Sequence, residues 1–136
     1  MLRHHAYYIE GDFEAFSPAL FSYIESEFAT SVRGNPDIFT FSCESFGIES
    51  AREIATLAQS RPLSLEKRIF IISFYSITVE AQNALLKTLE DSPSAQFFVF
   101  LPSSDILLPT VLSRMMDFRG ELGIKERAGD LRKMPP

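Results

Sequence analysis

Short apolar runs alternate along the chain with segments whose apolar residues recur at helical spacing. The runs lie at residues 6–12, 37–44, 68–74 and 96–102, and the last two are apolar almost throughout. Nearly continuous apolar runs rich in β-branched and aromatic residues are typical of strands buried on both faces of a parallel sheet. Their alternation with helical patterns therefore predicts an α/β domain with helices on both faces of a parallel sheet.

Polar residues ahead of the first two helical patterns predict where each helix begins. Ser17 and Pro18 predict the start of the first helix, because serine is a favoured N-cap and proline is favoured at the first helical position. Ser50 and Glu53 have the spacing of a capping box, in which each side chain binds a free backbone N–H group. We expect the second helix to begin at this pair.

The helix predicted at residues 79–91 carries polar residues within a core-facing pattern. Thr78 is its expected N-cap, and its leucines and alanines recur on one face, which we expect to pack against the sheet. Three polar residues interrupt that pattern, and they are Gln82, Asn83 and Lys87. From the residues alone, Asn83 can cap neighbouring backbone groups, and Lys87 can reach solvent while its stem covers apolar surface.

The C-terminal part of the chain carries weaker signals. Pro109 predicts a short helix, and residues 115–120 predict a fifth, shorter strand. Over residues 121–136 charged residues alternate with little apolar content, and the segment ends in two prolines. We therefore divide the chain into a domain at residues 1–120 and a charged tail or linker at residues 121–136.

Composition narrows the possible classes of function. The formal net charge of -5 argues against nucleic-acid binding by this chain alone, because phosphate contacts need clustered lysine and arginine. Cys43 is the single cysteine, and with His4 and His5 as the two histidines we expect no metal site and a solvated N-terminus. No apolar run approaches the ~20 residues that a membrane span needs, so we expect no membrane partner and a cytoplasmic protein.

Two segments together carry a resemblance to a known family. Residues 82–91 read QNALLKTLED, and residues 107–114 read LLPTVLSR, with a strand pattern between them. This order resembles the AAA+ module of clamp-loader subunits, above all the delta-prime and gamma/tau subunits of bacterial DNA polymerase III. The match covers residues 36–118 well, whereas residues 1–35 match only in layout. The resemblance implies a three-layer, P-loop NTPase-like (AAA+) module with a five-stranded parallel sheet flanked by helices.

The turn that should hold a nucleotide departs from the family pattern. A P-loop has the sequence G-x-x-x-x-G-K-[ST], whose backbone amides surround the phosphates while the lysine neutralises them. The corresponding stretch here is GDFEAFSPAL, in which Gly11 remains and the lysine is absent. Asp12 and Glu14 would repel phosphate, and Pro18 removes an amide. We therefore expect no tight ATP binding by this chain.

The magnesium-binding acids of the family are also missing. The strand that should end in them ends in Ile72-Ser73-Phe74, and the threonine expected after the fourth strand is not evident in LPSSD. These residues cannot hold Mg²⁺ as a carboxylate would. We therefore expect no enzyme activity from the chain by itself, with ATP and Mg²⁺ bound to a partner subunit. Two alternatives remain: a divergent, weak ATPase, or a non-replicative protein-binding module that kept the fold.

One catalytic feature of the family remains in the sequence. Ser113-Arg114 resembles the family's SRC motif, although Met115 stands where cysteine is usual. The resemblance implies that Arg114 acts as an arginine finger on ATP held by the adjacent subunit. The alternative is a surface arginine that caps the C-terminal end of its short helix, where the helix dipole favours a cation.

The resemblance also implies an assembly. It assigns Gln82, Asn83, Lys87 and Arg114 to a subunit interface, with hydrogen bonds within the module and to neighbouring subunits. The implied partners are gamma/tau-like and delta-like clamp-loader subunits, and through them the sliding clamp and primed DNA. Relatives carry a helical lid and collar after the module, so we expect a reduced form that docks by its module alone.

Overall fold

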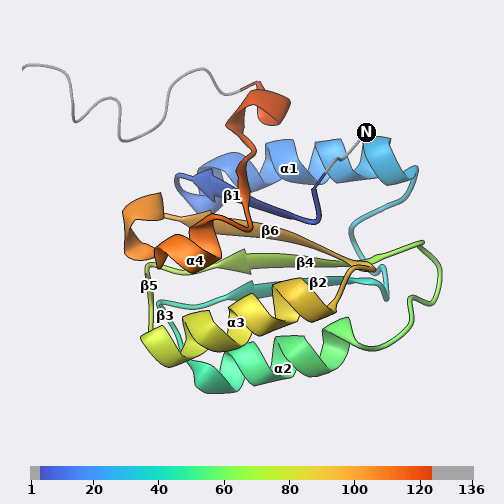
Figure 1. The fold of residues 1–136 in the computed structure, drawn as a ribbon. Coiled ribbons are helices and arrows are strands. Elements are labelled where there is room, and N and C mark those ends of the chain that lie inside the picture. Colours follow the sequence, from blue (N-terminus) through green and yellow to red (C-terminus); the bar gives the residue numbers. More distant parts are fainter. Residues whose placement is uncertain (1–3, 124–136) are drawn as a thin grey trace, which may run out of the picture.

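A computed structural model describes residues 4–123 of the chain, and five of its strands form one parallel sheet (Figure 1). The strands are β1 (Ala6–Glu10), β2 (Ile38–Ser42), β4 (Arg68–Ser73), β6 (Ala95–Leu101) and β7 (Met116–Asp117). Their order across the sheet is β2-β4-β6-β1-β7, and every neighbouring pair is parallel. The five-stranded parallel sheet and its short fifth strand are therefore confirmed.

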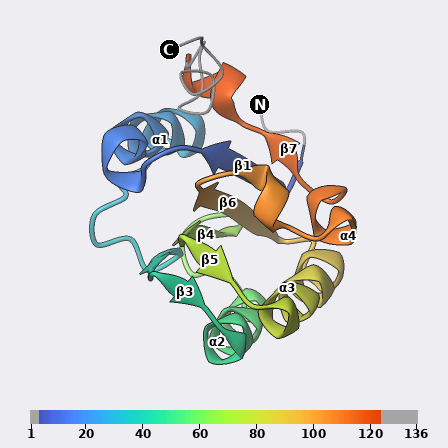
Figure 2. The same cartoon turned by 90° about the vertical axis from the view of Figure 1, so that its left-hand side faces the viewer.

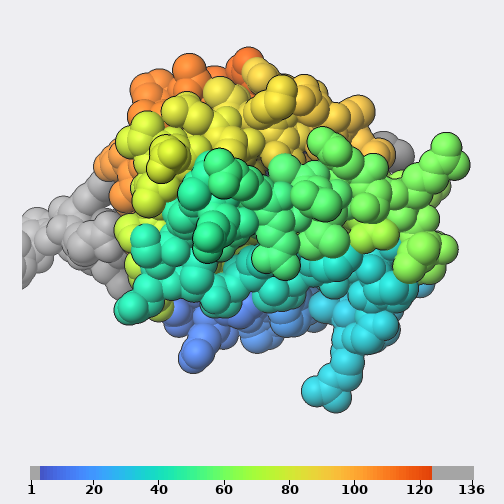
Figure 3. All heavy atoms as spheres, turned by 90° about the horizontal axis from the view of Figure 1, so that it is seen from below, coloured from blue at the N-terminus to red at the C-terminus, as the bar shows by residue number. Residues whose placement is uncertain are grey.

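Helices cover both faces of this sheet. They are α1 (Phe13–Phe28), α2 (Ile48–Ala58), α3 (Val79–Asp91) and α4 (Pro109–Leu112), with 3-10 turns η1 (Ser104–Ile106) and η2 (Arg119–Leu122). Helix α1 lies on one face, and α2 and α3 lie together on the other, which gives three layers (Figures 1 and 2). Figure 3 shows the outer surfaces of α2 and α3 side by side. Within residues 4–123, no helix combines the length and apolar character required to span a bilayer.

The alternating side chains of the inner strands divide the core into two layers. On β4, Ile69 and Ile71 pack in the layer beneath α1, whereas Phe70 and Ile72 pack in the layer of α2 and α3. All four are 0% exposed, and burial of each such side chain stabilises the fold by about 1.5–3 kcal/mol. The continuous apolar sequence of this strand is thus explained by two buried faces.

The first helix begins earlier than the sequence predicts. It starts at Phe13, and the carboxylate of Asp12 caps it by accepting a hydrogen bond from the Ala15 N–H at 3.2 Å. The prediction that Ser17 caps the helix is wrong: Ser17 is buried within the helix, and Pro18 lies inside it. Because β1 ends at Glu10, the chain turns directly into the helix, and the early cap prevails over the proline signal.

The second helix also begins earlier than predicted, at Ile48, with Gly47 as an N-cap that has no side-chain cap bond. Ser50 is therefore the third helical residue, and the predicted capping box is wrong. The cause is a small second sheet that the sequence did not reveal, formed by β3 (Ser45–Phe46) and β5 (Ser76–Ile77) in parallel. Each short strand runs directly into the cap of the following helix.

At the third helix the predicted cap is confirmed. The Thr78 hydroxyl accepts a hydrogen bond from the Ala81 N–H at 3.1 Å, and the Thr78 N–H donates to the Phe46 carbonyl at 3.1 Å. The second contact joins the start of α3 to the small sheet. The cap therefore fixes both the helix start and its position beside β3.

Near the N-terminus, His5 does not behave as a solvated residue. Its Nε2 atom donates a hydrogen bond to the Leu89 carbonyl at 2.7 Å, because the carbonyl can only accept. His4 is exposed, as predicted. At the other end, the predicted tail of residues 121–136 lies outside the described residues from residue 124 onward.

A buried carboxylate fixes the loop before β4. Asp37 is 0% exposed and accepts hydrogen bonds from the N–H groups of Leu63, Ser64 and Leu65 at 2.7, 2.6 and 2.6 Å. Burial alone would raise the pKa of Asp37, but these bonds and one from the Ser64 hydroxyl favour the charged form and lower the pKa. Folding therefore gains stability from the ionised form of Asp37.

Candidate functional site

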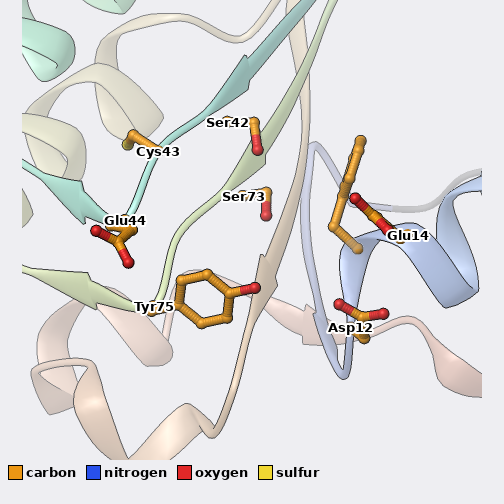
Figure 4. A pocket seen from close by; sticks show the side chains of 8 residues that line it. Asp12, Glu14, Ser42, Cys43, Glu44, Ser73 and Tyr75 are labelled. Carbon is orange, nitrogen blue, oxygen red and sulfur yellow. The ribbon is translucent and has the colours of Figure 1, made fainter.

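A cleft opens at the carboxyl ends of the strands, where open α/β sheets bind their ligands. Its volume is about 420 Å³. We call it the acidic cleft, and it is lined by Asp12, Phe13, Glu14, Ser42, Cys43, Glu44, Ser73 and Tyr75. Asp12 and Glu14 lie on the side of α1, across from Glu44 and Tyr75 (Figure 4). The stretch that corresponds to the family's P-loop borders this cleft, where we expected no tight ATP binding by this chain.

The acidic cleft presents carboxylates without a balancing cation. Among its described lining residues, Asp12, Glu14 and Glu44 are acidic and none is lysine, arginine or histidine. Ser73 ends β4 where a magnesium-binding acid was expected, and burial raises the pKa of the Cys43 thiol. The carboxylates do not converge on one point: within residues 4–123, no group of three or more potential metal-binding side chains is found.

The turn between β1 and α1 is only two residues long, Gly11 and Asp12. The Gly11 N–H donates to the Leu101 carbonyl at 3.0 Å, and the Ala15 N–H is taken by Asp12. Gly11 has a φ of 155°, and a Cβ atom there would lie 2.3 Å from the Phe16 ring. The Phe16 ring of α1 therefore covers the turn, and the N–H groups of Gly11 in the turn and Ala15 in the helix already have partners.

Arg114 lies directly after α4, and three contacts hold its guanidinium. Its Nε and Nη2 atoms donate to Glu90 Oε2 at 3.2 and 2.7 Å, and its Nη1 donates to the Ser113 hydroxyl at 3.3 Å. The Ser113 hydroxyl in turn donates to the Thr110 carbonyl at 2.9 Å. We call Glu90, Ser113 and Arg114 the arginine corner. The Arg114 side chain remains 46% exposed.

The residue that breaks the family's SRC motif is a core residue. Met115 is 6% exposed and packs in the cluster that joins α2 and α3 to the sheet. A methionine fills that space as a flexible apolar side chain. Met115 therefore packs in the core, while the neighbouring Arg114 stays at the surface.

The structure places Gln82 inside the module. Its side chain is 3% exposed; Nε2 donates to the Ile106 carbonyl at 3.1 Å, and Oε1 accepts from the Leu108 N–H at 2.6 Å. The predicted hydrogen bonds within the module are present, but both ends of the amide are used there. In this conformation Gln82 does not present its amide to a neighbouring subunit. It fixes the segment that leads into α4 and Arg114.

Asn83 and Lys87 face outward on the same helix. Both are exposed, and Lys87 pairs with Asp91 at 3.4 Å with 81% of its side chain accessible. No hydrogen bond of the Asn83 side chain is found within the described part of the chain, so the suggested backbone cap is not seen there. The role of Asn83 and Lys87 at a subunit interface stays a prediction. They differ from Gln82, whose amide is used within the module.

Glu90 was missed by sequence reasoning. It lies in the last turn of α3, where an acid faces the negative end of the helix dipole. An acid at this unfavourable position indicates that a cation lies nearby, and the position of Glu90 near the end of the predicted helix could be read from the sequence. The partner was not, because Arg114 is 24 residues away and reaches Glu90 only through the packing of α4 on α3.

The sheet order and helical layers define an α/β module of the AAA+ class. Two solved structures share this fold: a DNA polymerase III gamma subunit-related protein of Thermotoga maritima (TM-score 0.71, 23% identity) and the DNA clamp loader delta protein of Bacillus subtilis (TM-score 0.58, 16% identity). Each alignment covers 84% of this chain, and they cover 40% and 38% of the two structures.

Residues 4–120 match the model of the family described as DNA polymerase III, delta subunit, and the chain belongs to this family of clamp-loader subunits. It is also 32% identical over 74 residues, 53% of its length, to the DNA polymerase III subunits gamma/tau of Mycoplasma genitalium and Mycoplasma pneumoniae. The matched stretch spans 12% and 11% of those two proteins. The predicted family is thus confirmed.

Proposed function

We propose that this chain is a clamp-loader subunit of the delta-prime type, which hydrolyses no ATP itself and offers Arg114 to ATP held by a neighbouring subunit. The observation that carries the proposal is the arginine corner, an exposed guanidinium held by Glu90 and Ser113 on a module whose own cleft is acidic. The described lining of the acidic cleft holds no cation, whereas Arg114 keeps N–H donors that Glu90 and Ser113 do not use.

The acidic cleft does not fit a magnesium triphosphate. A triphosphate carries several negative charges, and here it would face Asp12, Glu14 and Glu44 with no cation in the described lining. The two-residue turn at Gly11 and Asp12 is too short for a loop whose amides surround phosphates. Both features support a module that leaves nucleotide and Mg²⁺ to a partner.

The arginine corner supports action on a neighbour's nucleotide. Arginine presents a planar fork of N–H donors that matches phosphate oxygens, and it stays charged at any ordinary pH. In other phosphoryl-transfer systems, an arginine supplied from a neighbouring protein accelerates the reaction by about 10³- to 10⁵-fold. We infer that the partners are gamma/tau-like and delta-like subunits, with the sliding clamp and primed DNA contacted through the assembled complex.

Substitution of Arg114 tests this proposal in the complex with the gamma/tau-like subunit of the same organism. We expect Arg114→Ala to lower the ATPase rate about 100-fold or more while the complex still assembles, because the charge on the transferred phosphate loses its partner. Arg114→Lys should recover little of the rate, since an ammonium lacks the fork. Arg52→Ala, an exposed arginine on α2, is the matched control and should leave the rate unchanged.

An assembled Arg114→Ala complex with the wild-type rate would remove Arg114 from the mechanism. The cleft volume of about 420 Å³ favours one alternative, a divergent and weak ATPase. Calorimetry of Mg²⁺-ATP with the isolated chain separates the two proposals. Micromolar affinity would support the weak ATPase, whereas no heat of binding up to about 1 mM ATP would support the subunit that acts on a neighbour.

A further inference from the structure

The contacts of the Arg114 guanidinium are distributed unevenly over its edges. Glu90 Oε2 accepts from Nε and from Nη2, which together form one side edge of the planar group. The Ser113 hydroxyl accepts from Nη1 at 3.3 Å. Of the five N–H donors of a guanidinium, these three are engaged within the described residues, so one donor on each terminal nitrogen remains.

The donor left on Nη2 lies on the edge opposite the side-chain stem, because the Nη2 hydrogen on the side of Nε is the one that Glu90 accepts. That edge can bind an oxygen of an anion, as arginine does with phosphates. The Glu90 contact uses the adjacent side edge, so a carboxylate and a phosphate can occupy the same guanidinium together. The geometry is therefore that of a cation supported from one side and open on the other.

We propose that Glu90 is a positioning residue for Arg114: it holds the side edge of the guanidinium so that the terminal nitrogens face the anion bound by a neighbouring subunit. This inference rests on the proposed function of Arg114 as an arginine finger. It assigns Glu90 no contact with the nucleotide.

Because the Glu90–Arg114 pair is exposed, its main effect is to orient the Arg114 guanidinium. The Glu90 and Arg114 side chains are 43% and 46% exposed, and ion pairs as accessible as this contribute little to folding stability. Arginine has a long stem with several free torsions, so a fixed contact removes many unproductive arrangements before the partner arrives. Misplacement of a reacting group by about 1 Å can cost about 100-fold in rate.

The supporting groups are themselves fixed. Ser113 is anchored through its bond to the Thr110 carbonyl at 2.9 Å, inside the turn that follows α4. Glu90 belongs to α3, whose neighbouring residue Leu89 is 1% exposed in the core. The two residues that contact the guanidinium thus come from different elements, α3 and the end of α4, which lie against each other.

The charge of Glu90 also acts against the finger, because a carboxylate beside the guanidinium weakens its attraction for a phosphate. If this effect prevailed, Glu90 would restrain Arg114, and its removal would raise the ATPase rate. The two roles therefore predict opposite signs for one substitution. The positioning role predicts a loss.

The experiment measures kcat and KM for ATP in the assembled complex with the gamma/tau-like subunit. We expect Glu90→Ala to lower kcat about 10-fold with little change in KM for ATP, because the finger acts in the transition state and ATP is bound by the partner. Glu90→Gln should restore most of the rate, since its amide oxygen still accepts from the guanidinium. Glu80→Ala, an exposed acid at the other end of α3, is the matched control and should have no effect.

A double variant separates the inference from the proposed function. In an Arg114→Ala background, Glu90→Ala should cause no further loss, because its target is gone. If Arg114→Ala lowers the rate but Glu90→Ala leaves it unchanged or raises it, the positioning role is overturned and the finger stands. If Arg114→Ala has no effect in an assembled complex, the proposed function fails and this inference fails with it.

A second readout needs no partner. In the free chain, the Nε–H group of Arg114 should give a distinct NMR signal in the wild type, because that hydrogen is bound to Glu90 at an Nε to Oε2 distance of 3.2 Å. The signal should move to the position of a free arginine in Glu90→Ala and stay in place in Glu80→Ala. An Nε–H signal that Glu90→Ala does not move would overturn the contact on which the inference stands.

Discussion

The acidic cleft and the arginine corner belong to one module but differ in charge: carboxylates line the cleft, whereas the corner exposes a cation. In the cleft, Asp12, Glu14 and Glu44 surround an open space, and no cation is found among the described residues that line it. In the arginine corner, a single cation is exposed and held by neighbouring side chains. The comparison shows that one module can combine a strand-end cleft whose described lining has no cation with a surface cation held by two neighbouring side chains.

The largest expected effect on stability distinguishes the buried carboxylate of Asp37, which supports folding, from an exposed carboxylate of the acidic cleft. Asp37→Ala should destabilise the protein by about 3 kcal/mol, because three backbone N–H groups lose their buried partner. Glu44→Gln, which changes an exposed cleft carboxylate, should change stability by less than about 0.5 kcal/mol. Urea unfolding at pH 7 measures both.

The pH dependence of the stability lost in Asp37→Ala provides a check. Because the pKa of Asp37 is lowered by folding, its contribution is complete above the ordinary aspartate pKa and is lost as the pH falls through the folded value. The stability gap between wild type and Asp37→Ala should therefore narrow below about pH 4, by about 1 kcal/mol per pH unit. A gap that stays constant from pH 7 to pH 2 would contradict this account.

Two buried glutamines test how the arginine corner is supported. Gln82→Leu should destabilise the protein by about 2 kcal/mol, because the Ile106 carbonyl and the Leu108 N–H lose their partners. Gln96 is 0% exposed, and its amide has no hydrogen-bond partner within residues 4–123. Gln96→Leu should therefore stabilise the protein by about 1 kcal/mol. A Gln82→Leu variant as stable as the wild type in thermal unfolding, or more stable, would show that the Gln82 contacts add no stability.

The turn beside the acidic cleft should resist a side chain at Gly11. Gly11→Ala should cost about 2 kcal/mol, because its new methyl group would meet the Phe16 ring and its φ of 155° is strained for alanine. The combined Gly11→Ala and Phe16→Ala variant should destabilise by less than the sum of the two single changes. Strict additivity in chemical unfolding would mean that the ring does not close the turn.

The smallest effect concerns the cap of α1. Asp12→Ala should cost about 1 kcal/mol, and Asp12→Asn should cost almost nothing, because asparagine caps helices as well as aspartate does. Calorimetry should find that neither change creates ATP binding, since the two-residue turn remains. Gain of binding in either variant would show that repulsion by Asp12, and not the short turn, excludes the nucleotide.

Most of the fold could be predicted because the inner strands β4 and β6 are buried on both faces. The run at residues 68–74 is apolar almost throughout, and β4 lies between two strands with helices on each side. The start of α2 near Ser50 was predicted incorrectly because the pairing of β3 with β5 sets it, whereas the start of α1 near Ser17 was missed because the local Asp12 cap prevails over the proline signal. The small sheet of β3 and β5 joins segments about thirty residues apart, and local cap patterns contain no trace of that pairing.

The site was predictable only in part. Ser113-Arg114 and the departures from the P-loop pattern could be read from short motifs, whose residues are adjacent in sequence. The contacts that hold the site residues in place join residues that are far apart in the sequence. Examples are the contacts between Glu90 and Arg114 and between Gln82 and Leu108. Such contacts depend on how α4 packs against α3, which no local pattern encodes.

The most direct measurement is a structure of the chain assembled with its gamma/tau-like partner, Mg²⁺ and a non-hydrolysable ATP analogue. We predict the nucleotide on the partner, with a terminal nitrogen of Arg114 about 3 Å from a γ-phosphate oxygen, and no nucleotide beside Gly11. A nucleotide bound in the acidic cleft, or an assembled complex in which Arg114 faces away from the partner's nucleotide, would contradict the account.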